Sequence, residues 1–467
     1  MIDNIKNSRI FKFLIGKDFK IKAIKLAIIL CLMFGTFFNA VFGYAVLGVC
    51  FAFVLFEFSA DSIIWLTILG TRYINVTYVY ILLIELLVIL LIKFVRDIVN
   101  KKIDCKNWRF ISICLIWVIT ALLMLLPLAT HYSFLSQVKR LLFFTVLILG
   151  VFYVKEINIK HLLTLFAISV VINVMLYLVA IRIKTQLEPN FPTKYSKGIV
   201  HRFSPFYKDP NFTGGILICA ITCWFVAYRK TWINQYTYFI GLLFLGMFSI
   251  MTISKATYLT IGLFGLFVVI ENIVITIKTK NPRHLLELLY YLGTLLIAGV
   301  IQWKYLDAFY QRIIHPEASM ISGNSDVINI NNITTGRLDI WKGYLTEMFS
   351  SWRTLLFGAG MGAPWVERPE HSMPLGYLYR GGLLVCCALI AIFIISAWPY
   401  LKKCKPYGYI PLVCITLIYA SIGSPSPQYI YVFVISFLCL CCNGVKIPNL
   451  QTDAVKEQIS IEQNIQT

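Results

Sequence analysis

Charged residues are scarce in this chain: they make up 14% of its 467 residues, whereas hydrophobic residues make up 59%. A soluble domain of this length carries about a quarter charged residues, so the composition excludes an ordinary soluble fold. A membrane-spanning helix needs roughly 20 mostly apolar residues, and the sequence repeats that pattern many times. We therefore expect an all-α, polytopic transmembrane helical bundle.

Cysteine is missing from the two longest polar segments, residues 182–210 and 303–375, although the chain has 13 cysteines. Exposed loops in oxidising exteriors favour paired cysteines, and these loops offer none. The same segments contain no Asp-x-Asp pair that would hold a metal ion. The basic N-terminal segment also lacks a small-residue cleavage site, so no cleavable signal peptide is expected.

Acidic residues are outnumbered, 22 against 42 Lys and Arg, which gives a net charge of +20. In a soluble protein this balance suggests nucleic acid. Here cytoplasmic loops that collect basic residues explain it, and no basic helix interleaved with aromatics supports nucleic acid as a partner. The expected partner is the lipid bilayer.

The apolar segments predict about twelve spans with both termini in the cytoplasm. Basic loops such as 93–109 and 278–284 should be cytoplasmic, which places residues 182–210 and 303–375 on the outer face. Residues 24–58 are long enough for two crossings, but the basic N-terminus requires an odd number before residue 59. We expect one long or bent crossing there, with a partly inserted turn around Asn39–Gly43. The candidate spans are 24–58, 74–92, 110–128, 139–154, 161–181, 211–227, 236–253, 257–277, 285–302, 376–398, 408–422 and 428–443.

This topology predicts four regions along the chain. They are an N-terminal transmembrane bundle (1–302), a large extracytoplasmic catalytic loop (303–375), C-terminal transmembrane helices (376–446) and a polar, disordered cytoplasmic tail (447–467).

The loop 303–375 concentrates polar residues in an otherwise apolar chain. A short helix is expected from Tyr305 to Ile314, and a second, amphipathic helix should lie along the membrane surface from residue 336. Its apolar face would present Leu338, Trp341, Leu345 and Met348, and Thr335 would cap it. Arg337 and His371 also lie in this loop. A cation and a titratable imidazole at a membrane surface suggest chemistry on an anionic, membrane-borne substrate.

The second outer loop, 182–210, is cationic although outer loops are usually poor in basic residues. Binding an anionic group is the natural reason for such charges. The loop ends at a span, where Asp209 or Asn211 can cap the helix and Pro210 can occupy its first turn.

Three segments of these loops together resemble one known family. RFSPFYKDPN (202–211) looks like its first outer arginine segment. GRLDIW (336–341) with GAGMG (358–362) resembles the arginine helix and glycine turn of its large outer loop, and HSMPLGYLYRGG (371–382) is similar to its histidine signature. The family is the O-antigen ligase and polymerase superfamily of bacterial membrane glycosyltransferases. Ser254-Lys255 departs from the family's frequent Ser-Arg, and lysine lacks the bidentate fork.

The resemblance implies transfer of a glycan from undecaprenyl diphosphate at the outer face of the bacterial cytoplasmic (inner) membrane. Arginines stabilise the negative charge that grows on the leaving diphosphate. His371 would be the general base on a sugar hydroxyl, and one displacement would invert configuration. No metal and no cofactor are expected. The implied catalytic residues are His371 and Arg337, and the implied diphosphate-binding residues are Arg202, Arg337, Lys208 and Lys255.

Each assignment has a structural alternative. His371 can be an interfacial imidazole that bonds a carbonyl. Arg337 can pair with Asp339 or Glu347, and Lys255 can simply extend to the membrane boundary.

Three functions also remain open. A polymerase joins lipid-linked repeat units into O-antigen or capsular polysaccharide, and the loose match to a diverse family favours it. A ligase moves finished glycan onto lipid A core with the same motifs. A flippase would place ionisable residues inside its spans, whereas here they concentrate in outer loops. The expected partners are the lipid-linked oligosaccharide, a chain-length regulator and a flippase.

Overall fold

The computed structural model describes residues 17–71, 76–103, 106–126, 128–183, 192–206, 209–280, 283–314, 337–360, 363–364, 366, 372–401, 411, 413–417 and 430–441. About 82% of these residues are helical, which confirms the predicted all-α class. Six of the described helices are long and apolar enough to cross a membrane, or up to seven if one bent pair counts as a span. The chain is therefore a helical membrane protein, while the count of twelve spans and the four-region division stay predictions. The tail 447–467 lies outside the described residues.

The N-terminal part is a helical hairpin, not the predicted single crossing. It comprises α3 (Lys17–Gly35), α4 (Val41–Glu57), the short η1 (Ala60–Ser62) and α5 (Ile63–Leu69). Lys25 Nζ lies 2.8 Å from Glu57 Oε1, and Lys22 pairs with Asp61. These ion pairs join the start of α3 to the end of α4, so α4 returns to the side where α3 begins. The reason is electrostatic, because lysines that are largely shielded from water in an apolar bundle need carboxylate partners.

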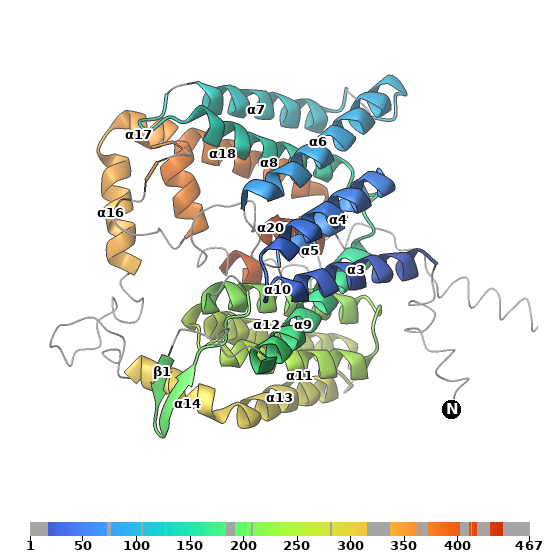
Figure 1. Cartoon of the computed structure of the whole chain (residues 1–467), viewed down its shortest axis with the longest axis vertical. Coiled ribbons are helices and arrows are strands. Elements are labelled where there is room, and N and C mark those ends of the chain that lie inside the picture. Colours follow the sequence, from blue (N-terminus) through green and yellow to red (C-terminus); the bar gives the residue numbers. More distant parts are fainter. Residues whose placement is uncertain are drawn as a thin grey trace, which may run out of the picture.

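The remaining helices run roughly side by side and are joined mainly by short turns (Figure 1). They are α6 (Val76–Val99), α7 (Trp108–Leu125), α8 (Phe134–Phe152), α9 (Ile159–Ile183), α10 (Pro210–Arg229), α11 (Gln235–Met251), α12 (Lys255–Thr279), α13 (Arg283–Ile301), α18 (Met373–Leu401) and α20 (Ile430–Cys441). A hairpin of antiparallel strands β1 (Pro192–Tyr195) and β2 (Gly198–His201) and the helices α14 (Trp303–Ile314), α16 (Arg337–Phe349) and α17 (Trp352–Phe357) gather at one end of this bundle.

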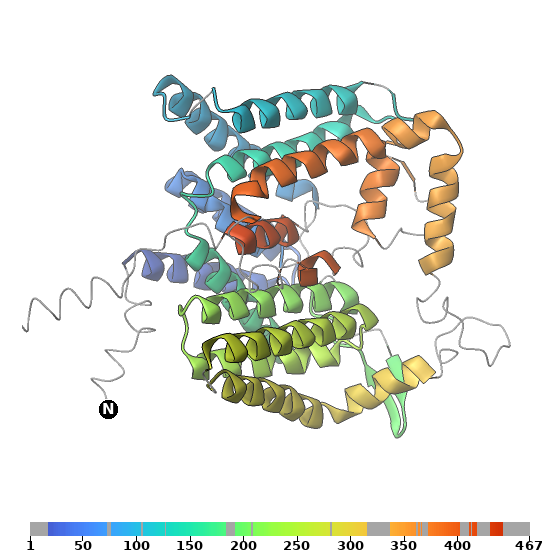
Figure 2. The same cartoon turned by 180° about the vertical axis from the view of Figure 1, so that it is seen from behind.

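We call this end the loop end; it lies on the left in Figure 1 and on the right in Figure 2. At the opposite end, which we call the ion-pair end, Lys93 pairs with Glu156 at 2.9 Å. There too, Arg229 pairs with Glu271 and Glu287 at 3.0 and 3.2 Å. The structure thus gathers the segments predicted to be outer at one end and the basic turns at the other. Which end faces the cytoplasm stays a prediction.

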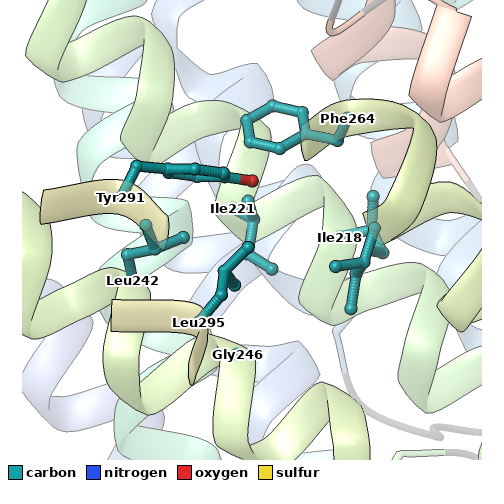
Figure 3. Close-up of a pocket in the computed structure, with 8 residues that line it drawn as sticks. Ile218, Ile221, Leu242, Gly246, Phe264, Tyr291 and Leu295 are labelled. Atoms are coloured by element: carbon teal, nitrogen blue, oxygen red, sulfur yellow. The ribbon is translucent and has the colours of Figure 1, made fainter. Parts of the chain in front are cut away.

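The helices α10 to α13 enclose a small crevice. The crevice among them has a volume of about 10 Å³, which is about the room that one water molecule needs. Figure 3 shows that its lining is apolar apart from the Tyr291 hydroxyl. The crevice is therefore part of the packed core.

The helix α16 exists as predicted, and one of its faces packs against the protein. Tyr344 and Met348 are buried, and Tyr344 packs in a cluster with Ile340 and with Tyr379 of α18. Of the residues predicted to face the membrane surface, Leu338 and Leu345 are exposed, whereas Met348 is buried.

Candidate functional site

The turn between α11 and α12 holds two guanidinium groups side by side. Arg202 Nε donates to the carbonyl oxygen of Thr252 at 3.0 Å, and Arg312 Nη1 donates to that of Ile253 at 2.8 Å. Ile253 has a φ of 48°, which is strained for a β-branched residue. Consecutive main-chain carbonyls at the end of a helix are good acceptors for cations, so this turn fixes both arginines.

The strands and α14 are fastened to the same turn. The amide of Phe203 donates to Met251 O at 2.9 Å, and the amide of Ser196 donates to Asp307 Oδ2 of α14 at 2.9 Å. The rings of Tyr258 and Phe309 stack with centroids 3.8 Å apart. The hairpin, the turn and α14 therefore form one unit that positions Arg202 and Arg312.

Four basic residues from four different elements interact at this point, and we call them the cationic cluster: Arg202, Lys255, Arg312 and Arg337. Arg202 is only 8% exposed. Burial, and then the charge of Arg312, lowers the pKa of Arg202 to about 9; the Asp209 carboxylate opposes the shift and Arg337 adds to it. Burial also lowers the pKa of Arg337, again opposed by Asp209. The positive charges thus repel one another, which an anionic ligand would relieve.

Two helix N-termini meet at the cationic cluster. Asp209 caps α10, as predicted, and accepts from the amide of Asn211 at 2.6 Å with Pro210 in the first turn. Ser254 caps α12, and its hydroxyl lies 2.9 Å from Asn211 Oδ1. Helix N-termini carry partial positive charge and bind phosphate. The arrangement therefore favours an anion that carries more than one negative charge.

A glycine turn fastens α17 to α18 at the same loop end. Gly358, Gly360 and Gly382 all have positive φ, and Gly360 N donates to the carbonyl oxygen of Arg380 at 3.0 Å. A Cβ at Gly358 would lie 2.5 Å from that same oxygen, so only glycine fits. At Gly382 the helix α18 bends, and its first residues, from Met373, form a separate segment at the loop end.

The structure brings together three of the predicted site residues: Arg202, Arg337 and Lys255. Lys208 and His371 lie outside the described residues, so their roles stay predictions; Ser372, directly after His371, is buried at the start of α18. Arg312 was not predicted. The available signal was its place in a cationic helix of the same outer loop, but its contact with Ile253 depends on the bend between α13 and α14, which measures 83°.

Comparison with family models, with curated proteins and with solved structures finds no match to this chain. Among the described residues, no group of three or more His, Cys, Asp or Glu side chains is placed to hold a metal ion. The functional argument therefore depends on the cationic cluster and its surroundings.

Proposed function

We propose that the protein is a membrane glycosyltransferase of the O-antigen or capsular polysaccharide polymerase type. It transfers a glycan from undecaprenyl diphosphate onto a lipid-linked repeat-unit acceptor at the outer face of the cytoplasmic membrane. The observation that carries this proposal is the cationic cluster with its two helix N-termini. The sequence resemblance supplies the glycan and the lipid carrier.

The chemistry follows from the charges. The leaving group is a lipid diphosphate, and its negative charge increases as the glycosidic bond breaks. Guanidinium groups already held in place stabilise that charge without reorganisation. His371, next to the start of α18, takes the proton of the acceptor hydroxyl, and a single displacement inverts the anomeric carbon.

Of the two other candidates, a ligase that transfers glycan to lipid A core would use the same cluster and differs in its acceptor. A flippase would line its path with ionisable residues inside the spans, whereas the cluster residues come from the turn after β2, the starts of α12 and α16 and the end of α14.

The test replaces Arg337 and, separately, His371 by Ala in a strain that lacks the native copy, and resolves the surface glycan on a gel. A polymerase loses long chains and keeps single repeats. A ligase loses all glycan on the core and accumulates lipid-linked polymer. Arg182→Ala, at the exposed end of α9 and outside the cluster, is the matched control and should keep the ladder. Wild-type ladders from both site variants would refute the proposal.

A further inference from the structure

Two more basic residues at the loop end lie on α8, apart from the cationic cluster. Lys139 Nζ is 5.5 Å from the centre of the Tyr80 ring, and the charge of Arg140 acts on the same tyrosine. The loop that precedes α8 is tied to α17 through His131 N, which donates to Ala359 O at 2.7 Å. The pair therefore sits at the same end of the bundle as the cluster.

The Arg140 side chain retains binding capacity. Its Nη1 atom is buried, and within the described part of the chain it has no hydrogen-bond partner. Gln137, nearly one turn earlier on α8, is 4% exposed, and its Oε1 is likewise unpartnered among the described residues. A guanidinium N–H that is shielded from water binds most strongly to a phosphate or carboxylate oxygen.

An apolar groove lies between α4 and α6, and Ile81, the residue after Tyr80, is part of its lining. It has a volume of about 330 Å³, within the range of about 300–1,000 Å³ that small-molecule sites occupy. The tyrosine that Lys139 approaches is therefore the chain neighbour of a residue that lines the groove. A Cβ built on Gly48 meets nothing within 4 Å. The lining residues are Tyr44, Leu47, Gly48, Phe51, Ile81 and Leu82.

The basic pair also borders the helix that His371 precedes. Phe144, one turn after Arg140, packs on Tyr377 in the first segment of α18, with ring centroids 5.7 Å apart. The residues of the cationic cluster come from other elements. Arg202 follows β2, Lys255 and Arg337 begin α12 and α16, and Arg312 lies near the end of α14. The loop end thus presents two separate groups of cations.

We propose that Lys139 and Arg140, with the α4–α6 groove, bind a second polyprenyl-linked phosphate: the basic pair holds the phosphate and the groove holds the isoprenoid chain. Charge complementarity selects the headgroup, and the lipid-facing, apolar groove selects a long hydrocarbon. The assignment rests on the proposed function, in which donor and acceptor are both lipid-linked, and it gives the acceptor lipid this site. A ligase, whose acceptor is not a polyprenyl phosphate, has no use for it.

The test counts undecaprenyl phosphate bound to the purified full-length protein by native mass spectrometry. The wild type should bind two molecules at saturation. Arg140→Ala and Gly48→Phe should each weaken the second binding at least tenfold and leave the first intact, and the retained first lipid shows that the variants are folded. Gly262→Phe is the matched control, because Gly262 is another exposed helical glycine with open space around its Cβ; it should bind two.

The proposal of a second site would be overturned if the wild type bound only one lipid molecule. It would also be overturned if Arg140→Ala and Gly48→Phe both still bound two. Displacement of the second lipid by excess phosphatidylglycerol would show a general anionic-lipid site and overturn the isoprenoid assignment. The lipid count does not require glycosyl transfer, so its result is independent of the proposed function. The glycan ladders of the Arg337 and His371 variants test that function.

Discussion

At the residue scale, the site depends on how arginines are held. Arg202 and Arg312 donate to neighbouring carbonyls of a strained turn, so their positions are set by the main chain. Arg312 also acts electrostatically on both Arg202 and Lys255. Its removal should therefore lower the positive potential of the whole cluster.

We predict that Arg312→Ala slows chain extension by about 10²-fold, the usual effect of removing one preorganised donor to developing charge. Lys304→Ala, an exposed cation on the same helix, should change the rate by less than about twofold because surface charges contribute little. The measurement is the rate of polymer growth by the purified protein on lipid-linked repeats. Equal decreases in the growth rate of the two variants would show that α14 contributes only its overall positive charge, and that the position of Arg312 does not matter.

The sequence predicted part of this arrangement and missed part of it. Basic residues in loops predicted to be outer pointed to Arg202 and Arg337, because outer loops are usually poor in basic residues and binding of an anion explains their presence. Arg312 was missed because a basic residue at the end of an amphipathic helix normally faces solvent. Its burial follows from the bend after α13, and no periodicity encodes that bend.

At the element scale, the glycine turn decides how α17 and α18 fit together. Gly358 and Gly382 approach so closely that a Cβ on Gly382 would lie 2.4 Å from the amide nitrogen of Gly358. Neither position tolerates a side chain, since each combines a positive φ with a main-chain neighbour.

We predict that Gly358→Ala lowers the free energy of unfolding by at least about 1–3 kcal/mol, from left-handed strain alone. Gly343→Ala, in the middle of α16 where the nearest contact is 3.9 Å away, should be neutral or stabilising by about 0.5–1 kcal/mol. Thermal unfolding in detergent measures both. A Gly358→Ala variant as stable as the wild type would contradict the close contact between α17 and α18.

The helix α16 shows a limit of sequence patterns. Its length and place were predicted, and Leu338 and Leu345 of the predicted membrane-facing stripe are exposed, but the packing of Ile340 and Tyr344 against the protein was not predicted. A helix at a membrane surface can carry apolar residues on two faces, one toward lipid and one toward protein. Periodicity finds amphipathic character and does not tell which partner each face meets.

At the scale of the whole molecule, the two ends differ in kind. The ion-pair end is closed by paired charges, such as Arg229 with Glu271 and Glu287. The loop end gathers positive charges with few carboxylates described among them. The N-terminal hairpin belongs to the ion-pair end. Lys22 pairs with Asp61, and the Asp61 carboxylate also accepts a hydrogen bond from the amide of Asn158. Asn158 follows Glu156, which pairs with Lys93 at that end.

We predict that single cysteines at Asn39 and Ser59, in a cysteine-free background, react from opposite sides of the membrane. The helix α4 separates these positions, and the pairing of Lys25 with Glu57 returns residue 59 to the side of the N-terminus. The measurement is labelling of whole cells with a membrane-impermeant maleimide. Labelling of residue 59 from outside would restore the single long crossing that the basic N-terminus suggested.

The strained turn at Ile253 has a consequence for turnover. Guanidinium groups that are already immobilised lose little freedom when an anion binds, and in the proposed reaction they would hold the departing lipid diphosphate as firmly as the donor that brought it. An enzyme with such immobilised arginines should release its lipid diphosphate product slowly. Once the sugar has moved, the exit of the carrier lipid, more than bond breaking, should then set the pace of each cycle.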